Sequence, residues 1–257
     1  MNKDTVLVTG ASSGIGLELA RTFARHGHDV VLSARSVDAL EELAARLRAE
    51  HGVRAEVVAA DLARPGAAYT LVQELVRRGI VVDVLVNNAG FAQRGAFTDV
   101  SEQRHLDMVQ VNITAVVQLT RLLLPGMIER RRGGVLNTAS TAAFLAGPYM
   151  AVYYATKAFV LSFTEALHEE VADTGVRVVA LCPGPTDTGF VAEADLEGAS
   201  LFKVGAQRPA EVAQVGFEAL QRNRAIAISG IKNALGVFGG RLAPRAVLRR
   251  IAGALNR

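Results

Sequence analysis

Short aliphatic and β-branched runs alternate with longer segments of helical periodicity along this chain. The short runs predict seven strands, at residues 5–8, 29–34, 56–59, 82–86, 134–138, 176–181 and 225–229. Helices are expected over 14–26, 37–50, from Pro65 onward, over 101–130 with a bend near Pro125, and over 153–173. Because the strands are apolar on both faces, they suit a parallel sheet covered by helices on both sides. The pattern therefore predicts a doubly wound α/β fold of about seven strands.

The composition fits a single domain over residues 1–257. Half of the residues are apolar and 21% are charged, which argues against a disordered chain. The one cysteine, Cys182, leaves no internal disulfide or cysteine-based metal site, so we expect no metal and a reducing, cytoplasmic location. The first strand begins at Thr5, which leaves no room for a signal peptide. The most apolar stretch, 113–128, contains Arg121 and Pro125 and is too short to span a bilayer.

A glycine-rich turn joins the first strand to the first helix. It reads Thr9-Gly10-Ala11-Ser12-Ser13-Gly14-Ile15-Gly16, with the spacing G-x-x-x-G-x-G. Glycines permit a tight turn and a close approach of the backbone to a phosphate. The helix N-terminus then offers free N–H groups and the positive end of the helix dipole. The strand before and the helix after this turn favour a site for the phosphates of a dinucleotide.

The same turn also spells G-x-S-x-G from Gly10 to Gly14, the nucleophile elbow of serine hydrolases, with Ser12 as the nucleophile. The motif follows the first strand, where such an elbow would be unusual, and the sequence contains no His-Gly-Gly oxyanion segment. A hydrolase that uses Ser12 is therefore an unfavoured alternative.

Tyr153 and Lys157 lie four residues apart in a predicted helix, which places both side chains on one face. A nearby ammonium stabilises phenolate over phenol, so the pKa of Tyr153 is expected to fall from about 10 toward neutrality. Such a tyrosine can donate a proton to a carbonyl oxygen, or accept one from an alcohol, near physiological pH. Ser140, at the end of the fifth predicted strand, lies thirteen residues before Tyr153.

These residues, together with Asn87-Asn88-Ala89-Gly90, Asn112 and Pro183-Gly184, follow the order and spacing of the short-chain dehydrogenase/reductase family. Residues 4 to 190 resemble its short form. The resemblance implies a Rossmann-like domain that interconverts a ketone or aldehyde and an alcohol by hydride transfer. It implies four catalytic roles: Tyr153 as acid/base, Lys157 as the group that lowers its pKa and holds the nicotinamide ribose, Ser140 as donor to the substrate carbonyl, and Asn112 as the holder of a relay water.

The resemblance also implies the cofactor contacts. Asp61, followed by Leu62, matches the family position beside adenine. Residues 87–90 look like the segment that shapes the nucleotide site, and Thr188 would contact the nicotinamide carboxamide. The expected cofactor-binding set is Gly10, Ser12, Ser13, Gly14, Ile15, Gly16, Arg35, Asp61, Leu62, Asn88, Ala89, Gly90, Tyr153, Lys157, Pro183, Gly184 and Thr188.

The end of the second strand favours NADP(H) over NAD(H). NAD sites place an acidic residue about twenty positions after the glycines. Here Ala34 stands eighteen positions after Gly16 and is followed by Arg35. A missing carboxylate removes repulsion toward a 2′-phosphate, and a guanidinium can bind that phosphate bidentately. Ser33 adds a hydroxyl, whereas Ser13 stands where many NADP-dependent relatives carry a basic residue.

Two C-terminal segments complete the prediction. The family resemblance implies that residues 189–210 form a substrate lid. Their apolar side chains Phe190, Leu196, Leu201 and Phe202 suggest a hydrophobic substrate, and would equally suit the inner face of an amphipathic helix. Residues 231–257 form a basic extension. Its helical part places Val247, Leu248, Ile251, Ala252 and Leu255 on one face, with Arg245 and Arg249 on the other.

The net charge of +3 conceals an uneven distribution. All 25 acidic residues lie at or before Glu218, and eight of the 28 Lys and Arg residues follow it. The near-neutral sum argues against a nucleic-acid partner. The basic extension is suited to an anionic partner such as an acyl carrier, to a membrane surface, or to packing on its own domain or a second subunit. The family resemblance implies a homodimer or homotetramer; the alternative to an enzyme is a nucleotide-binding regulatory module without turnover.

Overall fold

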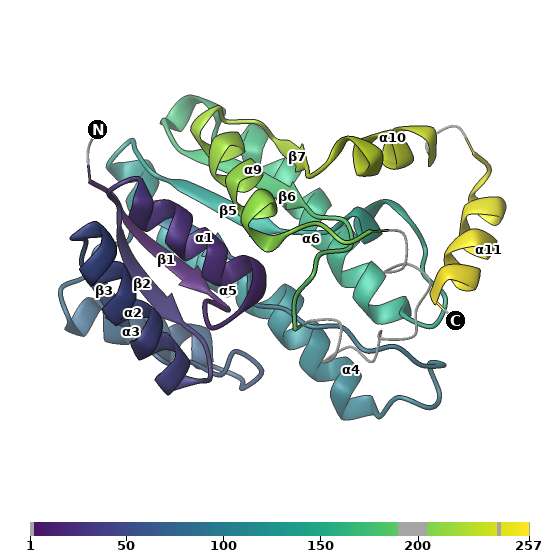
Figure 1. The fold of residues 1–257 in the computed structure, drawn as a ribbon, viewed down its shortest axis with the longest axis horizontal. Coiled ribbons are helices and arrows are strands. Elements are labelled where there is room, and N and C mark those ends of the chain that lie inside the picture. The colour runs from purple at the N-terminus through teal and green to yellow at the C-terminus, as the bar shows by residue number, and fades with distance from the viewer. Residues whose placement is uncertain (1–2, 190–204, 241–242, 257) are drawn as a thin grey trace.

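A computed structural model describes residues 3–189, 205–240 and 243–256. A parallel sheet with the strand order β3-β2-β1-β4-β5-β6-β7 forms its centre (Figure 1). The strands are β1 (Thr5–Thr9), β2 (Asp29–Ser33), β3 (Ala55–Val57), β4 (Val84–Asn87), β5 (Gly134–Thr138), β6 (Arg177–Cys182) and β7 (Ile226–Ile228). The predicted doubly wound fold is confirmed. The strand order reverses between β1 and β4, where open α/β sheets bind ligands beyond the carboxyl ends of the strands.

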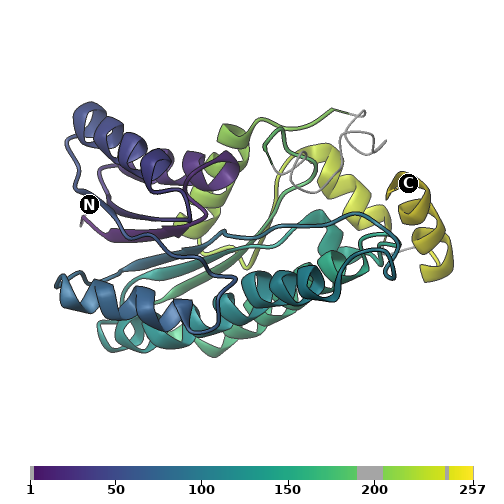
Figure 2. The same ribbon diagram turned by 90° about the horizontal axis from the view of Figure 1, so that it is seen from below.

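Helices cover both faces of the sheet (Figure 2). One layer contains α1 (Gly14–Arg25), α2 (Val37–His51) and α9 (Pro209–Gln221); the other contains α3 (Ala67–Arg77), α4 (Glu102–Val109), α5 (Ala115–Glu129) and α6 (Ala151–Glu170). Side chains alternate along β1: Leu7 joins the core beneath the second layer, whereas Val6 and Val8 join the core beneath the first. The strands are therefore apolar on both faces because both faces are buried.

The long helix before β5 contains an irregular turn. A π-helical segment, Gln110–Thr114, joins α4 to α5, so Glu102–Glu129 is one continuous helix. The irregularity lies at this segment rather than near Pro125, which sits inside α5. By length and composition alone this helix could cross a membrane, but Met108, Ala115 and Leu119 are buried against the sheet, as expected of a core helix.

Pro65 lies in the turn before α3 and not in its first helical turn. Gly66, with a positive φ of 81°, is the N-cap residue, so α3 begins only at Ala67. Pro65 was expected in the first helical turn, but α3 begins two residues after it. The turn between them needs the positive φ that Gly66 adopts.

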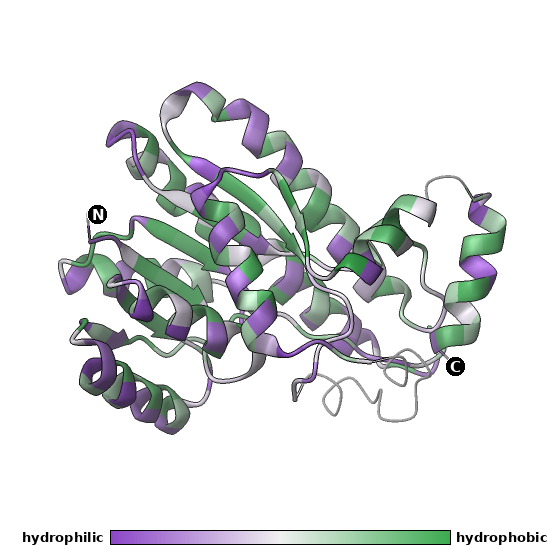
Figure 3. Ribbon diagram, turned by 45° about the horizontal axis from the view of Figure 1, so that its top comes forward, coloured by the Kyte–Doolittle hydropathy of each residue, from purple (hydrophilic) through white to green (hydrophobic). Residues whose placement is uncertain are grey.

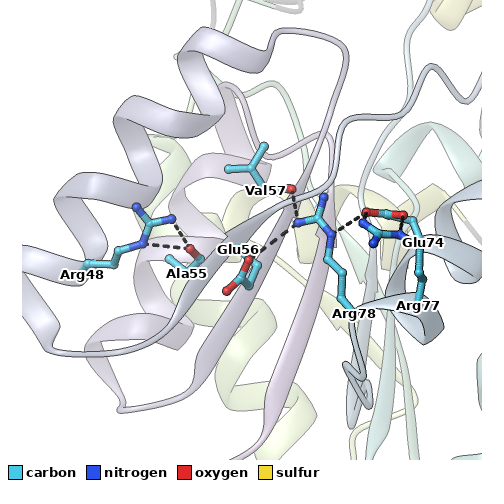
Figure 4. Close-up of polar contacts among 7 residues, drawn as sticks. All are labelled: Arg48, Ala55, Glu56, Val57, Glu74, Arg77 and Arg78. Atoms are coloured by element: carbon cyan, nitrogen blue, oxygen red, sulfur yellow. Dashed lines mark hydrogen bonds and ion pairs between the residues drawn. The ribbon is translucent and has the colours of Figure 1, made fainter.

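The exposed edge of the sheet, β3, is covered by arginine side chains (Figure 4). Arg48 of α2 donates to the carbonyl of Ala55, and Arg78 donates to the carbonyl of Val57 at 3.0 Å. Arg78 is in turn held by Glu74, with an Nε to Oε1 distance of 2.6 Å. These contacts occupy edge carbonyls that another strand would otherwise find free.

The C-terminal extension forms two helices, α10 (Ile231–Gly240) and α11 (Arg245–Asn256). They lie at the end of the molecule's long axis opposite α2 and β3 (Figure 1). The second helix was predicted; the first was not, because three glycines hide its periodicity. Of the predicted apolar face of α11, Leu248, Ala252 and Leu255 are buried or half-buried, whereas Val247 and Ile251 are exposed. Most of the predicted lid, residues 190–204, lies outside the described residues.

Candidate active site

A cavity of about 790 Å³ lies at the carboxyl ends of the strands. Its lining includes every predicted site residue except Gly16 and Asn112. It also includes residues from α10 and α11, so the cavity is bounded by segments from both halves of the chain. The predicted residues are therefore gathered around one space large enough for a cofactor and a substrate.

The glycine turn forms one end of this cavity, and its glycines are required by their surroundings. Gly10 has a φ of 67°, and a Cβ there would stand 2.9 Å from the Cα of Ala89. A Cβ on Gly16 would collide with the carbonyl of Gly10. Ser13, the N-cap residue of α1, makes no side-chain capping hydrogen bond to the described residues, and the first turn of α1 has no acidic residue. This uncapped N-terminus is suited to the phosphates of a dinucleotide.

Thr9 and Asn88 hold the glycine turn against the neighbouring strand. The Thr9 hydroxyl accepts from the backbone N–H groups of Asn88 and Ala89, both at 3.0 Å, and donates to the carbonyl of Val86. The side-chain amide of Asn88 donates to the carbonyl of Thr9 at 3.0 Å. The position of Asn88 was predicted; that Thr9 fixes the turn was missed, although a threonine at a buried strand end is the available signal.

Ser33 and Arg35 occupy the cavity wall at the end of β2. The hydroxyl of Ser33 is buried and has no hydrogen-bond partner among the described residues, although its residue lines the cavity. Arg35 is exposed beside it. A polar atom left without a partner in a cavity wall fits a site that a ligand hydroxyl or phosphate completes. Asp61, across the cavity wall, accepts from the backbone N–H of Ala63 at 3.2 Å.

Ser140, Tyr153 and Lys157 come together from β5 and α6. Ser140 follows β5 and caps a short 3₁₀ helix, Thr141–Phe144, by accepting from the N–H of Ala142 at 3.0 Å. Ser140 also hydrogen-bonds Tyr153. The Lys157 ammonium donates to the carbonyl of Thr138 at 2.7 Å and lies 5.8 Å from the centre of the Tyr153 ring. These three side chains thus form a connected group in the cavity wall.

The pKa of Tyr153 does not shift in the predicted direction. Burial raises it to about 12, and only the hydrogen bond with Ser140 acts to lower it. Burial also lowers the pKa of Lys157 to about 8. The expected lowering of the tyrosine pKa is wrong, because the ammonium is directed to the Thr138 carbonyl and both groups are desolvated. Tyr153 is therefore a neutral phenol.

Asn112 lies in the π-helical segment and does not line the cavity. Its amide nitrogen donates to the carbonyl of Phe91 and to Thr156 Oγ1, both at 3.0 Å, and its Oδ1 accepts from the N–H of Phe91 at 3.2 Å. Both amide hydrogens are thus engaged. The side chain ties the residues after β4 to α6, so a relay water at this position would have to be bound by the backbone of the irregular turn.

Several cavity residues were missed by the sequence reasoning. Beyond Ser140 and Tyr153 the wall is mainly apolar, formed by Phe144, Leu145, Met150, Val237, Leu248 and Leu255, with Tyr154, Lys232 and Asn233 as polar members. The Tyr154 hydroxyl lies 3.3 Å from Asn256 Oδ1, a bond that connects α6 to the last turn of α11. No local sequence signal joins residues 102 positions apart, so this wall required the structure.

Comparison with known proteins gives a consistent result. The family model for short-chain dehydrogenases matches residues 4–197. The dehydrogenase/reductase SDR family member 7B of Rattus norvegicus is 33% identical in an alignment of 259 positions that covers 96% of this chain and 80% of that protein.

Two solved structures are also similar to this chain over almost its whole length. A short-chain dehydrogenase from Sphingobium yanoikuyae in complex with NADPH has a TM-score of 0.83 at 33% identity and covers 93% of both chains. A structure of a 7β-hydroxysteroid dehydrogenase has a TM-score of 0.88 at 27% identity, covering 97% of this chain and 96% of that one. The serine hydrolase and the module without turnover are accordingly set aside. This chain belongs to the short-chain dehydrogenase/reductase family and is an NAD(P)-dependent oxidoreductase.

Proposed function

We propose that this enzyme reduces a hydrophobic ketone or aldehyde to an alcohol with NADPH, and catalyses the reverse oxidation with NADP⁺. The observation that carries the proposal is the hydrogen-bonded pair of Ser140 and Tyr153 at the boundary between the dinucleotide end of the cavity and its apolar wall. A carbonyl oxygen there can accept from the Tyr153 hydroxyl, and from Ser140 once its hydroxyl turns away from the Pro183 carbonyl, to which it donates at 3.4 Å. The rest of the substrate contacts aliphatic and aromatic side chains.

The proton chemistry follows from the ionisation states. The phenol of Tyr153, whose pKa is about 12, is protonated at neutral pH and donates its proton to the substrate oxygen. Ser140 donates a hydrogen bond to the same oxygen and stabilises its developing negative charge. When bound, the reduced nicotinamide supplies the hydride. Lys157 carries two N–H donors beyond the one that binds Thr138, which suits it to the ribose hydroxyls of the cofactor.

Selection of NADPH is assigned to Arg35 and Ser33. An exposed guanidinium and a buried hydroxyl border the same part of the cavity, and residue 34 is alanine rather than an acid. A 2′-phosphate would gain charge-assisted hydrogen bonds there and meet no carboxylate at the end of β2. The similarity to the NADPH-bound enzyme of Sphingobium yanoikuyae supports this assignment.

The substrate is proposed to be a bulky apolar carbonyl compound. The apolar wall formed by Phe144, Leu145 and Met150 continues onto α10 and α11 through Val237, Leu248 and Leu255. Desolvating such a wall favours an apolar ligand over a sugar or a small hydroxy acid. Similarity to an enzyme named for a hydroxysteroid substrate agrees with this size and polarity.

A homodimer or homotetramer is proposed from the outer face of the second helix layer. Leu106 and Val109 of α4 and Phe159 of α6 are 54%, 36% and 39% exposed, and α4 packs beside α6. Apolar side chains that are exposed on adjacent helices mark a surface that another subunit can cover. Sedimentation equilibrium of the wild type and of Phe159→Asp would test it, with the mutation expected to lower the mass.

The reaction is tested with purified enzyme, NADPH and a panel of aliphatic, aryl and polycyclic ketones, followed at 340 nm. Turnover is expected with apolar ketones and is expected to fall by about 10²–10⁴-fold in Tyr153→Phe, while NADPH binding by fluorescence is retained. Tyr69→Phe, a tyrosine that is 50% exposed on α3, is the matched control. Full activity in Tyr153→Phe, or NADPH binding without turnover on any carbonyl, would overturn the proposal.

A further inference from the structure

The C-terminal helix α10 presents a stripe of large apolar side chains to solvent. Ile231, Leu235 and Phe238 are 81%, 67% and 66% exposed. Their spacing of four and then three residues places them on one face of the helix. Figure 3 shows α10 largely in the hydrophobic colour at its end of the molecule. A row of exposed large apolar residues on one helix indicates a surface that contacts something apolar.

The following helix, α11, combines exposed apolar and basic residues. Val247 and Ile251 are 47% and 52% exposed, and Arg250, on a neighbouring face three residues after Val247, is also exposed. Arg245 and Arg249 are exposed as well. The sequence has no Asp or Glu after Glu218, so these cations have no acidic side chain on their own segment. The two helices together form the surface that we call the α10–α11 surface.

This surface is fixed to the catalytic domain. In the first turn of α10, the Asn233 amide donates to the carbonyl of Ser229 at 2.7 Å and to Gln207 Oε1 at 3.1 Å. At the end of α11, the buried Asn256 donates to the carbonyl of Pro148 at 3.0 Å and lies 3.3 Å from the Tyr154 hydroxyl. These hydrogen bonds fix both helices to the catalytic domain, so their exposed apolar side chains face away from it.

The inner sides of the same two helices line the cavity. Gly236 and Val237 of α10, and Leu248, Ile251 and Leu255 of α11, belong to its wall. Ile251 is both half-exposed and part of the wall, so the cavity and the outer surface meet at this side chain. Whatever binds the α10–α11 surface will therefore lie next to the apolar end of the cavity.

We propose that the α10–α11 surface docks on an anionic lipid bilayer. Interfacial helices bind membranes by burying an apolar face at the headgroup boundary while Lys and Arg contact anionic headgroups, and this surface has both groups. Self-association through the same surface is disfavoured, because it would bring together two basic surfaces whose own segments carry no acidic side chain. The docking requires neither cofactor nor turnover, so it stands or falls separately from the proposed reaction.

The test is co-sedimentation of the full chain with vesicles of phosphatidylcholine alone and of phosphatidylcholine with phosphatidylglycerol at 3:1. Binding is expected on the anionic vesicles, weakening as salt rises from 0.1 to 0.5 M. Leu235→Asp with Phe238→Asp, and separately Arg249→Gln with Arg250→Gln, are each expected to reduce the bound fraction at least tenfold. Their matched controls are Val76→Asp, at an exposed aliphatic residue of α3, and Arg46→Gln, at an exposed arginine of α2.

Neither pair lines the cavity, so ketone reduction in buffer should match the wild type and show that both variants are folded. Equal sedimentation with both vesicle types, or loss in the controls as large as in the variants, overturns the proposal. It is also overturned if the wild type ignores vesicles and Leu235→Asp with Phe238→Asp lowers its mass in solution, since the surface is then an interface between copies of this chain.

Discussion

Replacing Lys157 by methionine is expected to stabilise the protein at neutral pH while it abolishes catalysis. The side chain is 6% exposed, and burial lowers the pKa of its ammonium from 10.5 to about 8. Below pH 8 the lysine is charged in both the folded and the unfolded protein, so the full cost of burying that charge opposes folding. The pKa difference corresponds to about 3 kcal/mol. Methionine carries no charge and leaves the Thr138 carbonyl without its 2.7 Å donor, which costs about 1 kcal/mol.

The net expectation for Lys157→Met at pH 7 is a gain of about 2 kcal/mol in the free energy of unfolding. At pH 10 the folded protein holds Lys157 neutral and the unfolded chain holds it mainly charged, so the cost of burying the charge in the wild type shrinks to about 1 kcal/mol. The advantage of the variant should then disappear. Urea unfolding of both proteins at pH 7 and pH 10 measures this difference, because the other titrating groups cancel.

Lys232→Met provides the matched control, since Lys232 is exposed and loses little solvation on folding. Its effect should be small and equal at the two pH values. The reasoning that burial of the Lys157 ammonium opposes folding would be refuted by either of two results. One is a Lys157→Met protein less stable than the wild type at pH 7; the other is equal stabilisation at pH 7 and pH 10.

Three further predictions concern Arg35, Tyr153 and Asn256. Arg35→Glu should raise the KM for NADPH roughly 10- to 100-fold, which corresponds to the loss of a charged hydrogen bond of about 1.5–3 kcal/mol. The KM for NADH should change much less. Equal changes in the two KM values would contradict the assignment of Arg35 to the 2′-phosphate. Alcohol oxidation needs the phenolate of Tyr153, whose pKa is about 12, so kcat/KM for oxidation should rise about tenfold per pH unit from pH 6 to 9. A plateau below pH 8 would show another group in control. Asn256→Ala should lower the free energy of unfolding, measured by urea titration, by about 1–3 kcal/mol, because Tyr154 and the Pro148 carbonyl lose a buried partner. The KM for the ketone should rise as well. Unchanged values of both quantities would show that the end of α11 does not support the cavity wall.

The sequence is sufficient to predict the sheet because its strands are apolar on both faces, and this property depends only on local pattern. Helical spacing also places Tyr153 and Lys157 on one face, whereas Ser140 joins them, on sequence alone, only through the family resemblance. The ionisation of Tyr153 is not predictable in this way. Helical spacing sets which face a lysine occupies, but the ammonium's direction depends on the Thr138 carbonyl, and the burial of both groups depends on the whole layer around them.

The C-terminal helices also combine a property that the sequence predicts with one that needs the structure. Their basic character can be predicted from the sequence, but their position in the cavity wall depends on contacts with residues far away in the chain. A Cβ on Gly184, in the segment after β6, would collide with Asn233 of α10, so the glycine there permits the helix to approach. A Cβ on Gly147 would likewise collide with the ring of Tyr154, whose hydroxyl contacts Asn256. The packing of α10 thus explains the glycine at 184, whereas Gly147 makes room for the Tyr154 ring that in turn reaches α11. Removing α10 and α11 would open the cavity and also remove the charge of these helices. Paired substitutions at their exposed positions, and not truncations, therefore separate docking from catalysis.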